Sequence, residues 1–112
     1  MGVSIEVSNG VMSAYIYGDI DHHTAKIIRE EIDGEVIRKK PSLLILDFAN
    51  VTFMDSSGIG LVMGRYRLLQ ITHSRLQIVN VSPQTKKVMH LAGLDKLASI
   101  KVKGNREYES VK

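Results

Sequence analysis

Residues 43–60 read LLILDFANVTFMDSSGIG, and the rest of the chain can be organised around them. The opening segment, LLILDF at 43–48, is a nearly continuous apolar run, which is typical of a central strand covered on both faces. A short polar connection at 49–52 follows, and FMDSSGIG at 53–60 then leads into helical periodicity. The apolar face of that helix is expected to comprise Ile59, Val62, Tyr66 and Leu69. A strand that passes through a short loop into a helix is the repeating unit of parallel α/β sheets.

The region upstream predicts a β-hairpin. Val3, Ile5 and Val7 alternate with polar residues, which is the two-residue period of a half-buried strand. The dipeptide Asn-Gly at 9–10 is a strong signal for a hairpin turn, and residues 12–20 have the composition of the returning strand. The sheet should therefore open with two antiparallel strands.

A long amphipathic helix is expected after the hairpin. Asp21 is a suitable N-cap, and Pro41 marks the end of the helical pattern. The core-facing stripe of this helix should consist of Ala25, Ile28, Ile32 and Val36. The residues expected to face water are Lys26, Arg29, Glu30 and Asp33.

The region downstream completes the α/β pattern. A strand is expected at 75–81, then a short helix introduced by Ser82 and Pro83, a last strand at 98–102 and a charged tail at 103–112. The apolar stripe of the short helix should be Val88, Leu91 and Ala92. The element order predicts an α/β fold with a mixed, mostly parallel sheet of four to five strands, opening with a hairpin, and three to four helices.

The composition agrees with one compact domain over residues 1–112. The chain has 112 residues, of which 44% are hydrophobic and 24% charged, and it has no cysteine. Disulfides, thiolate metal sites and cysteine nucleophiles are excluded, which fits a cytoplasmic protein. The apolar runs are too short to span a membrane and the first residues lack a secretion signal, so we expect no membrane association.

The charge is distributed unevenly along the chain. The net charge of +3 would by itself suggest a nucleic-acid partner. Residues 1–56, however, carry 5 basic and 9 acidic side chains, whereas residues 57–112 carry 10 basic and 3 acidic ones. The basic residues of the second half are dispersed, without interleaved aromatic residues or a helix-turn-helix pattern: Arg65, Arg67, Arg75, Lys86, Lys87, Lys96, Lys101 and Lys103. We interpret them as solvated surface charge and expect no direct nucleic-acid binding.

Two loops should lie together at one edge of the sheet. The first, at 18–24, carries Asp19 and Asp21, and the second, at 53–58, carries Asp55, Ser56 and Ser57. Both loops follow the carboxyl end of a strand and precede a helix, and such loops share one edge of a parallel sheet, where α/β folds place their sites. These carboxylates and hydroxyls are therefore expected to form one surface patch.

Enzymatic activity is not favoured by the residues at that edge. His22 and His23 are adjacent, and the other two histidines, His73 and His90, are predicted at helix ends away from it, so a metal site with three or four ligands is not expected. Ser56 lacks a nucleophile elbow and a well-placed histidine base.

The glycines that follow Ser57 do not form a phosphate loop or a dinucleotide-binding motif. Gly58, Gly60 and Gly64 are poor helix formers, and we interpret them as positions of close approach to a neighbouring strand. The chain is therefore expected to be a non-enzymatic protein without a cofactor or metal.

A serine at a helix start remains, and it allows two interpretations. Ser56 or Ser57 could be an N-cap, which contributes about 1 kcal/mol. A hydroxyl there could also accept a phosphate of about −1.5 to −2 charge, which a helix N-terminus tolerates. Inside an interface beside Asp19, Asp21 and Asp55 the same charge would be unfavourable, so phosphorylation would act on binding with little effect on stability.

These residues resemble a known family, the anti-sigma factor antagonists of the STAS domain class. FMDSSGIG at 53–60 is similar to the family's phosphorylation motif, and GDIDHHTA at 18–25 is similar to its second signature loop. The resemblance continues through GRYR at 64–67 and Ser82-Pro83, and so covers nearly the whole chain. It is strongest to the members that act in the sigma-F system of sporulation.

The resemblance implies a single STAS domain and a partner-switching cycle. The unphosphorylated protein would bind an anti-sigma factor that is also a serine kinase, and would so release the sigma factor. The kinase would use ATP to phosphorylate Ser56, and a PP2C-like serine phosphatase would reverse the modification. The partner-binding residues implied are Asp19, Asp21, Asp55, Ser56, Ser57 and Gly58. Asp19 stands where the family often has glutamate.

Two alternatives stay open at this stage. One is an antagonist in a general stress-response module, which would have the same chemistry but a different sigma factor. The other is a stand-alone STAS module that binds a small ligand such as a nucleotide.

Overall fold

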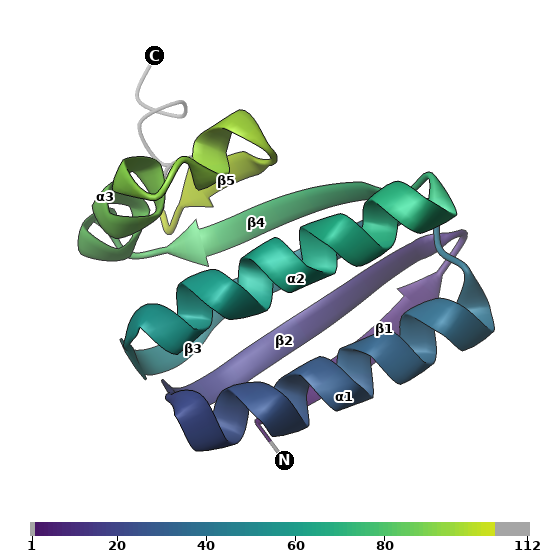
Figure 1. The fold of residues 1–112 in the computed structure, drawn as a ribbon, viewed down its shortest axis with the longest axis horizontal. Coiled ribbons are helices and arrows are strands. Elements are labelled where there is room, and N and C mark those ends of the chain that lie inside the picture. The colour runs from purple at the N-terminus through teal and green to yellow at the C-terminus, as the bar shows by residue number, and fades with distance from the viewer. Residues whose placement is uncertain (1, 105–112) are drawn as a thin grey trace.

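The computed structural model describes residues 2–104, and its element order agrees with the prediction. The elements are β1 (Val3–Ser8), β2 (Val11–Ile20), α1 (His22–Lys39), β3 (Leu43–Met54), α2 (Ser56–Thr72), β4 (Arg75–Val81), α3 (Pro83–Leu91), the short 3-10 helix η1 (Leu94–Lys96) and β5 (Ser99–Val102). Most of the predicted charged tail lies outside the described residues. The predicted α/β class is confirmed (Figure 1).

The five strands form one mixed sheet in the order β1-β2-β3-β4-β5. β1 and β2 are antiparallel, and the remaining neighbours are parallel. The hairpin turn is made by Asn9 and Gly10, whose φ angles are +53° and +79°. Two positive φ values fit the turn type whose twist matches that of the flanking strands, and Asn-Gly adopts it at low cost. The predicted opening hairpin is confirmed.

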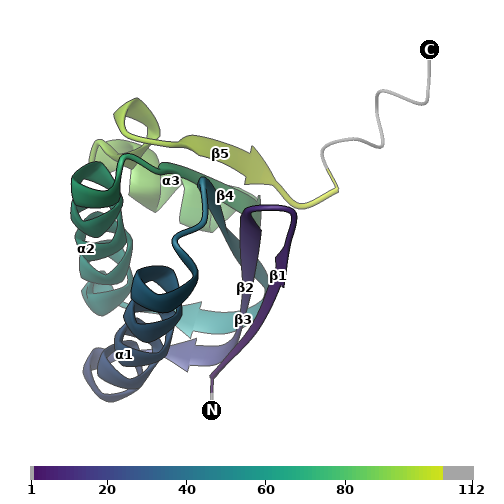
Figure 2. The same ribbon diagram turned by 90° about the vertical axis from the view of Figure 1, so that its right-hand side faces the viewer.

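The helices α1 and α2 lie side by side on one face of the sheet (Figure 2). Leu44, Leu46 and Phe48 of β3 are buried, while Leu43, Ile45 and Asp47 between them are only partly buried. The expectation that this strand is covered on both faces is therefore wrong. Leu43 and Ile45 lie on the face of the sheet without helices, and the side chains of neighbouring strands bury them only in part. This partial burial is sufficient to explain why they are apolar.

β3 is longer than the apolar run that predicted it. The strand continues from Leu43 to Met54, so residues 49–52 are part of it and do not form a connection. Its pairing with β4 ends at Asp47↔Val79, but its pairing with β2 extends to Ile20↔Met54. The second half of β3 thus has a strand neighbour on one side only, and its two polar residues, Asn50 and Thr52, are exposed.

The predicted apolar stripe of α3 is wrong in detail. Val88 is 44% exposed and Leu91 is 79% exposed, and Ala92 is exposed as well. Met89 of α3 and Leu94 of η1 are fully buried instead. A helix as short as α3 contains too few turns for its apolar residues to define one face without ambiguity.

Candidate functional site

The loops after β2 and β3 are joined directly. The backbone N–H of Asp55 donates to the carbonyl of Ile20 over 3.1 Å. The hydroxyl of Thr52 donates to a carboxylate oxygen of Asp19 over 2.7 Å. Asp19 also lies opposite Phe53 in the strand register. The structure therefore brings the two predicted loops together at one edge of the sheet.

Asp21 is the N-cap of α1, as predicted. Its carboxylate accepts from the backbone N–H groups of His23 and Thr24, each over 2.9 Å. The hydroxyl of Thr24 in turn accepts from the backbone N–H of Asp21, which completes a capping box. The hydrogen bond from the Thr24 N–H is the main reason why the pKa of Asp21 lies below its usual range. Asp21 is thus held as an ionised carboxylate at the surface.

Asp55, and not a serine, is the N-cap of α2. Its carboxylate accepts from the backbone N–H of Ser57 over 2.7 Å. Ser56 is the first residue of the helix and Ser57 the second, so the expectation that one of them caps the helix is wrong. Aspartate is as good a capping residue as serine and stands one position earlier. Ser56 is exposed, whereas Ser57 is partly buried.

Gly58 is required by the packing of the loop. It is buried, and a Cβ placed on it would overlap the Cγ and Sδ atoms of Met54. Close approach is therefore confirmed at Gly58, although the neighbour is a side chain of β3. At Gly60 and Gly64 a Cβ would meet nothing within 4 Å, so the same expectation is wrong for those two residues.

A groove of about 340 Å³ lies between the first turns of α1 and α2. The residues that line it are His22, Ala25, Lys26, Arg29, Ser57, Gly60 and Leu61. One wall is therefore basic, in contrast to the acidic loops beside it. Within residues 2–104, no group of three or more His, Asp or Glu side chains is close enough to hold a metal ion.

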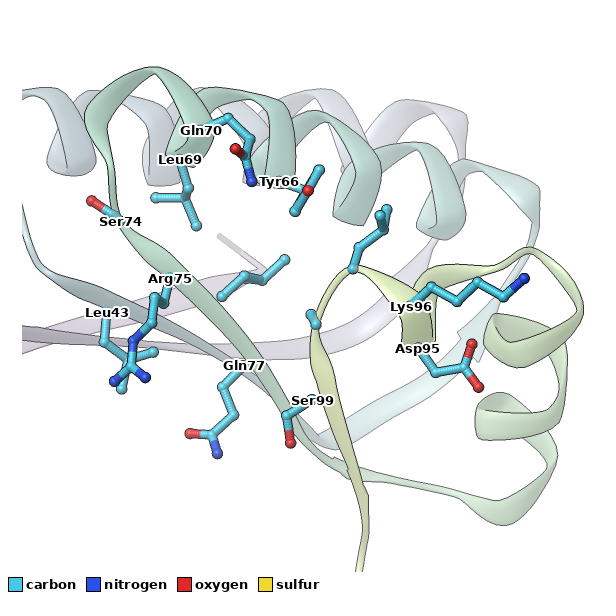
Figure 3. A pocket seen from close by; sticks show the side chains of 13 residues that line it. Leu43, Tyr66, Leu69, Gln70, Ser74, Arg75, Gln77, Asp95, Lys96 and Ser99 are labelled. Atoms are coloured by element: carbon cyan, nitrogen blue, oxygen red, sulfur yellow. The ribbon is translucent and has the colours of Figure 1, made fainter.

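A larger cavity, of about 590 Å³, lies at the other end of the sheet (Figure 3). It is lined by residues at the amino ends of β3, β4 and β5, including Leu43, Arg75 and Ser99, together with Tyr66 of α2 and Lys96 of η1. The predicted site residues follow the carboxyl ends of β2 and β3. This cavity is thus separate from them.

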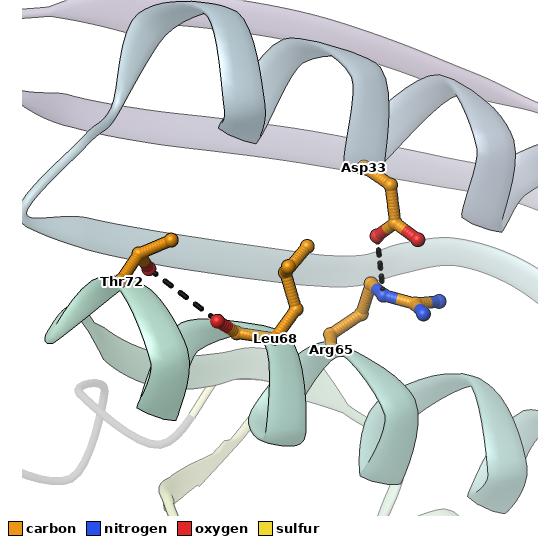
Figure 4. A network of polar contacts seen from close by, with 4 residues as sticks. All are labelled: Asp33, Arg65, Leu68 and Thr72. Carbon is orange, nitrogen blue, oxygen red and sulfur yellow. Dashed lines mark hydrogen bonds and ion pairs between the residues drawn. The ribbon is translucent and has the colours of Figure 1, made fainter.

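An ion pair between Arg65 and Asp33 joins α2 to α1 (Figure 4). Arg65 Nε lies 2.8 Å from Asp33 Oδ1, and the Arg65 side chain is only 5% exposed. The prediction that Arg65 is solvated surface charge is therefore wrong, and so is the expectation that Asp33 simply faces water. The spacing of Arg65 from the buried residues Leu61 and Leu69 places it on the apolar stripe of α2, a signal present in the sequence.

Burial dominates the electrostatics of that pair. Loss of hydration raises the pKa of Asp33 and lowers the pKa of Arg65, and the attraction between the two charges offsets only part of each shift. The pair therefore positions the two helices but is not expected to be a large net source of stability.

Comparisons with known proteins agree with this architecture. The STAS domain model matches residues 2–107. The chain is 31% identical over 98 residues to an anti-sigma F factor antagonist of Paenibacillus polymyxa, an alignment that covers 88% of this chain and 84% of that protein. It is 28% identical over 105 residues to an anti-sigma-B factor antagonist of Listeria monocytogenes, which covers 90% of each.

Solved structures give the same result. The anti-sigma factor antagonist SpoIIAA in its unphosphorylated form has a TM-score of 0.77 at 30% identity, covering 97% of this chain and 95% of that one. SpoIIAA from Bacillus in the phosphorylated form has a TM-score of 0.71 at 30% identity, covering 98% and 99%. None of the helices described for residues 2–104 is both long and apolar enough to cross a membrane. The chain belongs to the STAS domain family and, within it, to the anti-sigma factor antagonists that resemble SpoIIAA.

Proposed function

We propose that the unphosphorylated chain binds an anti-sigma factor that is also a serine kinase, and so frees the sigma factor of the sporulation sigma-F system. Transfer of a phosphate from ATP to Ser56 ends this binding, and a PP2C-like phosphatase restores it. Each of these partners works in the cytoplasm in this scheme, without direct contact between the chain and nucleic acid or membrane. The likeness to anti-sigma F factor antagonists supports the assignment to the sigma-F system. The geometry at Ser56 supports the phosphorylation switch.

The observation that supports the proposal most strongly is that the N-cap of α2 and the candidate phosphate acceptor are two different residues. Asp55 caps α2, so the exposed Ser56 is not needed for that task. Among residues 2–104 the Ser56 hydroxyl makes no hydrogen bond, whereas those of Thr24 and Thr52 in the same loops do. A hydroxyl in this position can be modified without breaking a contact that the fold uses.

The electrostatics at Ser56 favour an effect on binding over an effect on folding. A phosphate at the first turn of a helix is favoured by about 0.3–1 kcal/mol. Buried in an interface beside Asp55 without a counter-charge, the same phosphate costs about 2–5 kcal/mol. Because about 1.4 kcal/mol is a factor of ten, the affinity for the partner should fall by about 30-fold or more.

Asp19, Asp21 and Asp55 are proposed to meet basic groups of the partner, and Ser57 to lie in the same contact. Each of the three carboxylates also accepts a hydrogen bond: Asp21 and Asp55 accept from backbone N–H groups of their own loops, and Asp19 accepts from Thr52 of β3. Substitution by asparagine preserves an acceptor oxygen and removes only the charge, so Asp19→Asn tests the contact better than alanine does. Gly58 is buried, and we propose that it contributes through the shape of the loop.

The experiment is a binding and phosphorylation assay against a panel of anti-sigma factors from the host genome, covering sporulation and stress-response types. With ATP, the kinase in the panel should add one phosphate to wild type, which peptide mass spectrometry should locate on Ser56. Ser56→Ala should bind and resist release. Ser56→Asp should bind weakly with a nearly unchanged melting temperature.

Ser57→Ala is the matched control, because it removes a neighbouring hydroxyl whose backbone N–H still donates to Asp55. It should still be phosphorylated on Ser56 and released, while its affinity before phosphorylation should fall only slightly, since a hydroxyl of the same proposed contact is lost. Phosphate on Ser57 alone, or no binding by any member of the panel, would refute the assignment.

A general stress-response role is the second candidate, and the likeness to anti-sigma-B factor antagonists favours it. The phosphorylation chemistry would be the same. The panel separates the two candidates by which anti-sigma factor binds more tightly.

A further inference from the structure

The second half of β3 has an open side. Pairing with β4 stops at Asp47↔Val79, while β2 accompanies β3 as far as Met54. Beyond the last residue of β4, the chain turns at Ser82 into α3. The side of β3 that β4 leaves open therefore lies next to the first turns of α3 and not next to another strand.

A groove of about 350 Å³ occupies this position. We call it the β3–α3 groove, and the residues that form most of it are Val51, Phe53 and Met54 of β3 with Gln84, Thr85 and Val88 of α3. None of its lining residues carries a charge. Its volume is at the small end of the range for ligand pockets, which suits a side chain better than a whole small molecule.

The groove exposes two large apolar side chains. Phe53 is 56% exposed and Val88 is 44% exposed, and both line it. The exposed residues Ile37 and Ile71 lie apart, near the C-terminal ends of α1 and α2. The groove between the first turns of α1 and α2 and the cavity at the amino ends of the strands contain no large apolar side chain of this exposure. Clustered apolar exposure bordered by polar groups is typical of a contact surface, whereas single exposed residues are ordinary.

The position of the groove indicates its occupant. Phe53 is two residues before Asp55 and pairs in register with Asp19. The groove is thus continuous with the two loops to which the anti-sigma factor is proposed to bind. A protein that covers Ser56 extends over Phe53 with little further area.

We propose that the β3–α3 groove receives an apolar side chain of the anti-sigma factor, with Phe53 as its main anchor and α3 as its far wall. The inference rests on the proposed function and adds a second contact to it. The matching partner surface carries an aliphatic or aromatic side chain next to a basic one, since Asp19 and Asp55 lie beside the groove. The loops would carry the phosphate-sensitive part of the binding, and the groove would carry affinity that does not depend on charge.

The test measures affinity for the panel member that binds wild type, by calorimetry. Phe53→Ala should weaken binding by about 10-fold or more, in the range found for central aromatic residues of interfaces. Thr85→Trp should also weaken it, because the larger side chain fills the groove. Ile71→Ala is the matched control: it truncates a residue that is 76% exposed and distant from the loops, and it should bind within about twofold of wild type.

A second measurement separates the groove from the charged loops. Raising the salt concentration screens exposed charges but leaves apolar contact nearly unaffected. Phe53→Ala should therefore keep the wild-type salt dependence of Kd, while Asp19→Asn should reduce it. Melting temperatures of all variants establish that each is folded, and Val88→Ala supplies an independent variant on a helix that tolerates alanine.

The outcomes are distinguishable. If wild type binds no anti-sigma factor, the proposed function fails and this inference fails with it. If wild type binds and folded Phe53→Ala, Val88→Ala and Thr85→Trp all bind within about twofold, only the groove is refuted. If light scattering finds wild type dimeric and Phe53→Ala monomeric, the groove belongs to a second copy of this chain, which also overturns the proposal.

Discussion

Two substitutions that break the same ion pair should have very different effects on stability. Arg65 is 5% exposed and Asp33 is 29% exposed, with Nε and Oδ1 2.8 Å apart. Asp33→Ala would leave the guanidinium buried without a counter-charge, and breaking a buried pair in this way costs about 3–5 kcal/mol. Because water reaches part of the Asp33 carboxylate, we expect a smaller loss, of about 2–3 kcal/mol. Arg65→Met would keep most of the apolar stem and leave a carboxylate that water already reaches, so its cost should stay below about 1 kcal/mol.

Urea unfolding followed by circular dichroism measures these differences, with an unchanged m-value as the check that the unfolding remains two-state. At about 4 °C per kcal/mol for a domain of this size, Asp33→Ala should lower Tm by roughly 8–12 °C. The double variant should recover most of that loss, because the buried charge is gone. Equal losses for the two single variants, or a loss below about 0.5 kcal/mol for Asp33→Ala, would contradict the view that an unpaired buried guanidinium is the cost.

Two other perturbations follow from the same structure. Gly58→Ala should destabilise the fold by about 1–2 kcal/mol, because the added Cβ would overlap Met54. In a chain that already carries Met54→Ala, the same substitution should cost much less. A Gly58→Ala variant as stable as wild type would contradict the packing at this loop. The pKa of Asp21 is lowered by folding, so its contribution to stability is present above its unfolded pKa and is lost as the pH falls through the folded one. The difference in unfolding free energy between wild type and Asp21→Asn should therefore shrink as the pH falls, and a difference that stays constant with pH would refute the assignment.

The order of the elements could be predicted from the sequence because its signals are local. The Asn9-Gly10 turn and the caps Asp21 and Ser82 each depend on residues within one turn of themselves, and each is found where the pattern placed it. The prediction for Arg65 is wrong because a basic residue is usually exposed, whereas the position of Arg65 on the apolar stripe of α2 buries it. The stripe of α3 was misassigned because a short helix has too few periods to determine its orientation.

The sequence predicts which residues come together at the candidate site, but not what each of them does there. Parallel topology suffices to bring the loops of Asp19 and Asp55 to one edge, because both follow carboxyl ends of neighbouring strands. Which side chain caps α2 depends on whether its oxygen lies within hydrogen-bond distance of a free backbone N–H. The carboxylate of Asp55 accepts from the N–H of Ser57. That detail decides whether Ser56 is structural or free, and sequence patterns do not contain it.

The unequal pairing of β3 accounts for the character of this edge. If β4 paired with β3 over its full length, Phe53 would lie between two neighbouring strands. The two loops would then begin at the edge of a fully paired sheet. Because the pairing of β4 with β3 ends at Asp47, β2 and β3 continue as a two-stranded ribbon that carries Asp19 and Asp55 at its tip. Such a ribbon is only marginally stable alone, and the bonds from Thr52 to Asp19 and from Asp55 to Ile20 hold it together. Asn50 and Thr52, the polar residues that obscured the length of the strand in the sequence, lie in this ribbon, and Thr52 donates one of the bonds that hold it together.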